Sequence, residues 1–340
     1  MLFCCVTSFG VLLVTVGGSW DITNHLLNKP ETFFSPPHAL MYLGVTIALF
    51  AVIFSFLLWR RLEEKSDYKL SIKVMGVGIF LLVGAGPFDF IWHENFGLDG
   101  LLSPSHMTLI VGMLLCCTGA FFGISKYIIN QNNDKVIFLV PMAVLPMWLA
   151  ASGMISALSL PFSNTEFFKF NPDPNLAVIV ASLAFPFLIS FSLCSAARLG
   201  RFRFGILSVT GVLFLMVNGF TGITTNQSIS DTIGFYFLNV IPIVLGDFVI
   251  CSYKEKRFML FAGGLFGAVF SLVYYPYIVY TYNEVMSGSL VSPSMMAMVY
   301  YELLPLIFSY TVIAGVVLGL LGAFFSKKLL QLRAESNAIS

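Results

Sequence analysis

The chain has 340 residues, of which 58% are hydrophobic and only 10% are charged, and its mean hydropathy is +0.89. This composition excludes an ordinary soluble domain and predicts a polytopic membrane protein. The formal net charge of +1 provides no basic excess for nucleic acid, so we expect the lipid bilayer as a partner and no nucleic-acid partner.

Ten apolar runs are long enough to cross a bilayer. They cover residues 2–20, 37–59, 70–91, 104–128, 136–158, 176–197, 205–223, 234–252, 258–281 and 296–325. Lipid leaves a spanning backbone only the helix or the closed barrel, and runs of this length favour the helix. The sequence therefore predicts an all-α polytopic integral membrane protein with about ten transmembrane helices.

The distribution of basic residues indicates how these helices are oriented, because Lys and Arg are retained on the cytoplasmic side. With the N-terminus inside, 16 of the 18 Lys and Arg residues fall on the inner side, and only Lys29 and Lys169 fall outside. We therefore expect a multi-pass protein of the cell membrane with both termini in the cytoplasm. The loops after the first and third helices then lie on the outer face.

All four histidines of the chain belong to two copies of one pattern. In each copy an Asp precedes a His by four positions, an acid follows that His after six, and a second His follows it after thirteen. The first copy is Asp21, His25, Glu31 and His38, and the second is Asp89, His93, Asp99 and His106, at a constant offset of 68 residues. This offset predicts a parallel repeat of two helical hairpins. It also suggests a four-helix unit over 1–130 and a histidine-free six-helix unit over 131–340.

The spacing within each copy predicts where the side chains meet. An Asp and a His four positions apart share one face of a helix end. Ser35-Pro36 and Ser103-Pro104 are typical of an N-cap followed by the first helical residue, which puts the second His in the first turn of the next helix. Each hairpin is thus expected to bring one carboxylate and two imidazoles together at the outer edge of the membrane.

Two imidazoles and a carboxylate are a common ligand set for a metal ion that keeps positions open for water, oxygen or substrate. Zinc would indicate hydrolysis by metal-activated water, whereas copper or iron would indicate redox chemistry with oxygen. Two other interpretations are open: haem with histidine axial ligands, and Asp–His pairs that only stabilise helix ends. Glu302, an acid in the last apolar run, is a further candidate for the site or for proton transfer.

The second copy resembles the copper-site segment of the C subunit of the particulate methane and ammonia monooxygenases. The resemblance rests on Asp89-x-x-Trp92-His93, an acid at Asp99 and Ser103-Pro-Ser-His106-Met. It covers about residues 86–110, recurs more loosely at 18–42 and does not extend to the other six helices. The resemblance implies copper at Asp89, His93 and His106, with Asp99 as an alternate or outer ligand.

By the internal repeat, the same roles would fall to Asp21, His25 and His38, with Glu31 in place of Asp99. The family's C subunit is shorter and works with further subunits, so other membrane subunits are expected partners. The predicted function is that of a copper-dependent, monooxygenase-like oxidoreductase acting on a small or lipophilic substrate. A zinc-dependent membrane hydrolase, and a non-enzymatic electron carrier or accessory subunit binding metal or haem, are the alternatives. The spacing leaves open whether two separate sites or one shared dinuclear site forms.

Overall fold

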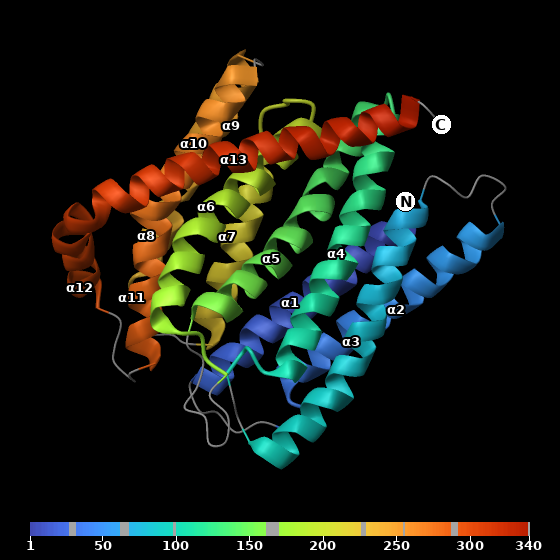
Figure 1. Cartoon of the computed structure of the whole chain (residues 1–340), viewed down its shortest axis with the longest axis horizontal. Helices are drawn as coiled ribbons and strands as arrows, with labels where there is room; N and C mark the ends of the chain where they lie inside the picture. Colours follow the sequence, from blue (N-terminus) through green and yellow to red (C-terminus); the bar gives the residue numbers. More distant parts are fainter. Residues whose placement is uncertain are drawn as a thin grey trace. The chain divides into compact units, whose positions relative to one another are not determined.

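The computed structural model describes residues 1–26, 32–61, 68–97, 100–160, 170–225, 229–253, 256–286 and 292–338. Nearly all of these residues are helical, and no strand occurs among them (Figure 1). Ten helices within these ranges are long and apolar enough to cross a membrane. The prediction of an all-α polytopic membrane protein with about ten spanning helices is therefore confirmed.

The described helices group into two compact units that divide after Val180. The first unit contains α1 (Leu2–Leu26), α2 (Pro36–Arg61), α3 (Lys69–Phe96), α4 (Pro104–Asn130), a 3-10 turn η1 (Asp134–Leu139) and α5 (Val140–Ser159). Helix α6 (Pro174–Leu199) crosses the division. By packing, α5 thus belongs with α1 to α4, and Ser8 of α1 donates a hydrogen bond to the Met142 carbonyl of α5 (2.8 Å). The boundary drawn after residue 130 from the histidine pattern stays a prediction about function.

Helices α3 and α4 pack with their backbones almost in contact because small residues line the interface. A Cβ added to Gly78 would lie 2.5 Å from the Cys116 amide nitrogen, and one added to Gly112 would lie 3.0 Å from the Leu82 amide nitrogen. Membrane helices use small residues in this way, since lipid provides no hydrophobic drive for helices to associate. This close packing holds the end of α3 against the start of α4.

Helices α1 and α2 make the same contacts 68 residues earlier. A Cβ added to Gly10 would lie 2.8 Å from the Ala48 amide nitrogen, and one added to Gly44 would lie 2.9 Å from the Val14 amide nitrogen. Each of these four residues has its counterpart, at the offset of 68, among the four that pack α3 on α4. The repeat recognised from the Asp and His residues therefore extends along the helical hairpins themselves.

The second unit contains the remaining helices and two π-helical turns. Its elements are α7 (Ile206–Thr225), α8 (Ile233–Phe237), α9 (Val240–Tyr253), α10 (Lys256–Val269), η3 (Phe270–Tyr274), α11 (Tyr275–Met286), α12 (Pro293–Met298), η4 (Val299–Leu303) and α13 (Leu304–Ala338). The run predicted as one helix over 296–325 thus begins in α12, passes through a π-helical turn and continues as α13. Its membrane-spanning part is Thr311–Leu330.

Asp247 is a buried acid of the second unit, and it caps a neighbouring helix. Its Oδ2 atom, carried by α9, accepts hydrogen bonds from the Gly205 amide (2.9 Å), the Ser208 amide (2.9 Å) and the Ser208 hydroxyl (2.7 Å). The first amides of a helix lack intrahelical acceptors and carry a partial positive charge. A carboxylate at the start of α7 accepts hydrogen bonds from these amides, and its negative charge is stabilised by the partial positive charge there. The role of Asp247 is therefore structural.

We expect Asp247→Ala to lower the stability of the protein by about 2 kcal/mol or more, because it leaves the start of α7 without its acceptor. The measurement is the midpoint of thermal unfolding in detergent. Asp231→Ala is the matched control, since Asp231 is exposed in the same unit. Equal midpoints for the two variants would contradict the capping role.

Candidate metal centre

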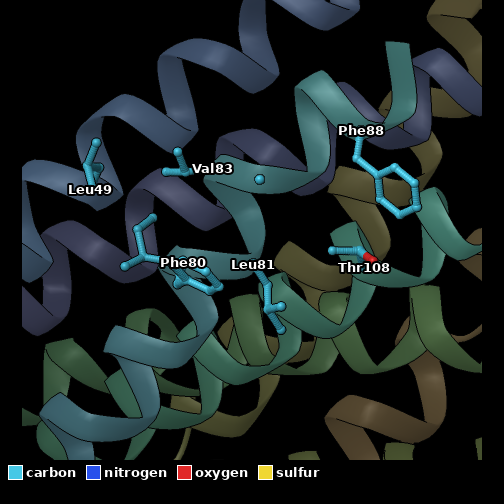
Figure 2. Close-up of a pocket in the computed structure, with 8 residues that line it drawn as sticks. Leu49, Phe80, Leu81, Val83, Phe88 and Thr108 are labelled. Carbon is cyan, nitrogen blue, oxygen red and sulfur yellow. The ribbon is translucent and has the colours of Figure 1, made fainter. Parts of the chain in front are cut away.

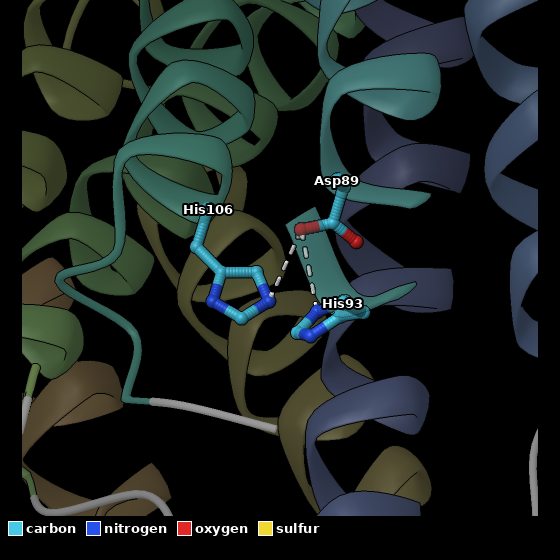
Figure 3. Close-up of side chains that lie close together, drawn as sticks. All are labelled: Asp89, His93 and His106. Carbon is cyan, nitrogen blue, oxygen red and sulfur yellow. Dashed lines mark ion pairs between the residues drawn. The ribbon is translucent and has the colours of Figure 1, made fainter. Parts of the chain in front are cut away.

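Three side chains of the second copy converge where α3 ends and α4 begins. Asp89 and His93 lie one turn apart on α3, and His106 lies in the first turn of α4 (Figure 3). The Nε2 atoms of His93 and His106 each lie 3.5 Å from the Asp89 Oδ1 atom. One ligand atom from each residue lies within 4.8 Å of the others. The structure thus forms the predicted group of one carboxylate and two imidazoles.

Backbone carbonyls fix the orientation of both imidazoles. His93 Nδ1 lies 2.9 Å from the Gly97 carbonyl oxygen, and His106 Nδ1 lies 3.3 Å from the Gly100 carbonyl oxygen and 2.9 Å from the Ser103 hydroxyl. A carbonyl only accepts hydrogen bonds, so in the tautomer that donates Nδ1–H to these carbonyls each Nε2 presents a lone pair toward Asp89. Histidine ligands of metal ions are held in this way, by a hydrogen bond from the ring nitrogen that does not bind the ion.

Two glycines place these carbonyls. Gly97 ends α3 with a φ of 67°, a left-handed conformation that favours glycine, and its amide donates to the His93 carbonyl (3.0 Å). Gly100 lies against the backbone of Phe170 so closely that a Cβ would overlap it, and the adjacent Leu102 amide donates to the Phe170 carbonyl (3.1 Å). The turn that carries the Gly100 carbonyl is therefore held in place from the side.

The two distances between Asp89 and the histidines suit a metal ion. A separation of 3.5 Å is longer than a good hydrogen bond. It matches two ligand atoms that are each about 2.1 Å from one ion and subtend about 115° there, close to a tetrahedral angle. The Asp89 Oδ1 atom is buried and makes no hydrogen bond to any described residue. Burying such an oxygen is costly, and a bound cation would offset the cost.

In the first copy the structure brings Asp21 of α1 to His38 of α2. Their Oδ1 and Nε2 atoms lie 2.9 Å apart, and His38 Nδ1 lies 3.0 Å from the Thr32 carbonyl oxygen. Helix α1 continues through His25, as predicted, but the His25 side chain falls outside the described residues. Two of the three predicted ligands of the first copy are therefore in contact.

The additional acids proposed from the sequence are not placed at the site by the structure. Glu31 and Asp99 lie outside the described residues. Glu302 lies in η4 of the second unit, and its side chain is exposed. Their participation stays a prediction.

One cavity of about 620 Å³ in the first unit connects the two copies. Asp21 and His38 line it together with Asp89, His93 and His106. From these polar groups it extends along α2 and α3 toward the middle of the spans. Its apolar lining there includes Val45, Leu49, Leu82, Val83, Ala85 and Leu109.

A second cavity, of about 560 Å³, adjoins the first and shares Leu49 and Val83 with it (Figure 2). Its lining is apolar except for Thr108, whose hydroxyl is already used in a hydrogen bond to the Pro104 carbonyl (2.7 Å). Phe80, which also lines it, is 77% exposed on the surface of a membrane-spanning helix. The two cavities therefore share part of one wall, and while the second borders that apolar surface, the first contains the Asp and His residues.

Sequence reasoning missed the groups that support the ligands. The carbonyls of Thr32, Gly97 and Gly100 carry no side-chain signal, because any residue has a carbonyl. One signal was present, since Thr32 and Gly100 are separated by the same 68 residues as the histidines they hold. Tyr42, which lines the cavity one turn after His38, was missed as well.

Comparison of the chain with family models, with curated proteins and with solved structures found no match. The function is therefore inferred from the site itself.

The support of His106 by the Gly100 carbonyl leads to a testable result. We expect Gly100→Val to weaken metal binding by about 10- to 100-fold, because the added side chain would displace the turn from Phe170 and move that carbonyl. A competitive chelator titration measures the affinity. Gly84→Val on α3 is the control, since a Cβ there meets nothing within 4 Å. Unchanged affinity in Gly100→Val would contradict the role of the carbonyl.

Proposed function

We propose that this protein is a membrane-embedded copper-dependent oxidoreductase, monooxygenase-like, that acts on a small lipophilic substrate. Asp89, His93 and His106 would hold the ion. The observation that carries the proposal is that these three ligands border a cavity whose apolar part extends along α2 and α3 into the membrane span.

The choice of copper rests on the ligand set and on the sequence. Two imidazoles and a carboxylate suit copper, zinc and iron, and three protein ligands leave positions for oxygen or substrate. The resemblance of residues 86–110 to the copper-site segment of the monooxygenase C subunit favours copper among them. When bound, copper would supply one-electron redox chemistry and oxygen activation, and the residues described above would bind and orient it.

The lipophilic character of the substrate follows from the path to the site. The two cavities meet at Leu49 and Val83, near the middle of α2 and α3. We propose that a compound dissolved in the bilayer enters along these mostly apolar walls, which include Leu49, Val83 and Leu109, before it meets the ligands. A strongly polar substrate would lose its hydration along the same path at a high cost.

Metal analysis tests the proposal. Protein purified in mild detergent, and analysed for metals and by EPR, should hold at least one copper ion per chain with a signal typical of nitrogen and oxygen ligands. Zinc alone, in a protein without redox response, would overturn it.

A second candidate is a zinc-dependent hydrolase, and the position of Glu94 favours it. This carboxylate lines the same cavity but does not belong to the three-ligand group. A general base occupies such a position, near the metal-bound water but not bound to the metal. In a hydrolase, Glu94→Gln would abolish ester or amide cleavage and keep the zinc. In the proposed oxidoreductase, Glu94→Gln would leave the copper content and its EPR signal unchanged.

We also propose that the centre lies on the outer face of the cell membrane, because Lys and Arg are concentrated in the segments expected on the inner side. Asn95, exposed at the end of α3, and Arg61, exposed at the far end of α2, provide a matched pair of labelling positions. In whole cells an impermeant maleimide should label Asn95→Cys and spare Arg61→Cys. The reverse pattern would show that the centre faces the cytoplasm.

A further inference from the structure

We propose that Asp21 and His38 hold a second metal ion in the same cavity, so that one substrate molecule is exposed to both ions. The proposal deepens the function proposed above and rests on it for the nature of the ion. It answers a question that spacing leaves open, because the structure shows both ligand sets bordering one cavity of about 620 Å³.

The two copies have the same local structure around the histidine of their second helix. The Ser35 amide donates to the Thr32 carbonyl (2.9 Å), as the Ser103 amide does to the Gly100 carbonyl (3.1 Å). The same two carbonyls lie 3.0 Å from His38 Nδ1 and 3.3 Å from the corresponding atom of His106. His38 is therefore oriented as His106 is, with Nδ1 facing a backbone carbonyl and Nε2 directed at an aspartate of the preceding helix.

The distance between the two described ligands also suits an ion. Oδ1 of Asp21 and Nε2 of His38 lie 2.9 Å apart. Two atoms at this separation, each about 2.1 Å from one ion, subtend about 90° there, an angle typical of square-planar and octahedral sites. A direct ion pair would have the same distance, so the experiment below must separate the two arrangements.

The charges around the cavity favour cations in it. Two aspartates of the ligand sets and Glu94 line it, and no Lys or Arg is found among the described residues that line it. Tyr42 lines the cavity together with Asp21 and Asp89, so the two carboxylates border the same space. Like charges that face one partly buried space repel each other, and bound cations would relieve that repulsion.

The experiment counts ions. Purified protein is stripped with a chelator, loaded with excess copper, desalted and analysed for copper per chain. The test variant is His38→Asn, because asparagine places an amide nitrogen where Nδ1 lies and so keeps a donor for the Thr32 carbonyl while it removes Nε2. The matched variant is His93→Asn with His106→Asn, and thermal unfolding checks that each variant is folded.

We expect two copper ions per chain in the wild type and one in each of these variants. In His38→Asn, the ion at Asp89, His93 and His106 should remain and give its EPR signal. The matched variant, which lacks the two histidines of that centre, should not show this signal. One ion per chain in both the wild type and His38→Asn would overturn the second site and favour a plain Asp21–His38 ion pair, while leaving the proposed function intact. No copper in any of the proteins would instead overturn the proposed function.

Discussion

Protein that carries both His93→Ala and His106→Ala is expected to lose the ion at Asp89. The double substitution removes two of the three ligands and leaves only the Asp89 carboxylate. The loss of metal affinity should therefore exceed the roughly 10- to 100-fold that is typical of changes in groups that only support ligands. Metal content and chelator titration measure it. Each imidazole is held by a carbonyl through Nδ1, so both Nε2 atoms are positioned before any ion arrives, and removing them removes a preorganised site.

Asn95→Ala is the control for this experiment. Asn95 lies two residues beyond His93, is exposed, and its amide donates to the Ile91 carbonyl of its own helix (2.7 Å). The metal content of the Asn95→Ala variant should equal that of the wild type. If the folded double histidine variant bound as many ions as the wild type, the ion assigned to Asp89 would have to bind elsewhere, and the assignment of the centre would be wrong.

The second large effect concerns the apolar path. Val83→Trp should lower turnover of a lipophilic substrate by about tenfold or more while leaving the metal content unchanged, because the indole would fill the junction that the two cavities share. Loss of one well-placed contact is worth about 1–3 kcal/mol in such pockets, and an obstructed path removes more than one. The ratio of turnover to metal content is the quantity to compare.

Val77→Trp provides the matched substitution. Both valines lie on α3, and both are largely exposed, at 55% for Val77 and 44% for Val83, but Val77 lines neither of these two cavities. A tryptophan there should face lipid and change little. Equal turnover in the two variants would show that substrate does not pass between Leu49 and Val83.

Much of this site could be predicted from the sequence because its ligands include histidine, which is rare in this chain. The four histidines occur only in the repeated pattern, and Ser-Pro marked the helix starts that bring His38 and His106 next to the aspartates. Helical geometry then sufficed to predict one carboxylate and two imidazoles in each hairpin.

Other features depended on packing between helices, which spacing does not reveal. Residues of α2 and α3 line the shared cavity together, and the sequence could not distinguish this arrangement from two separate outer loops. The π-helical turn before α13 also departs from the single run expected over 296–325. Asp247 illustrates the same limit, since its partners, Gly205 and Ser208, lie about forty residues away on another helix.

X-ray absorption at the copper edge, on protein purified without added metal, tests the central claim most directly. We predict copper bound only by nitrogen and oxygen, with the scattering pattern of imidazole, and a copper content in His93→Ala with His106→Ala that is lower than in the wild type by the ion at Asp89. Sulfur ligands, or a protein that contains no copper, would contradict the assignment of copper to the Asp89, His93 and His106 centre.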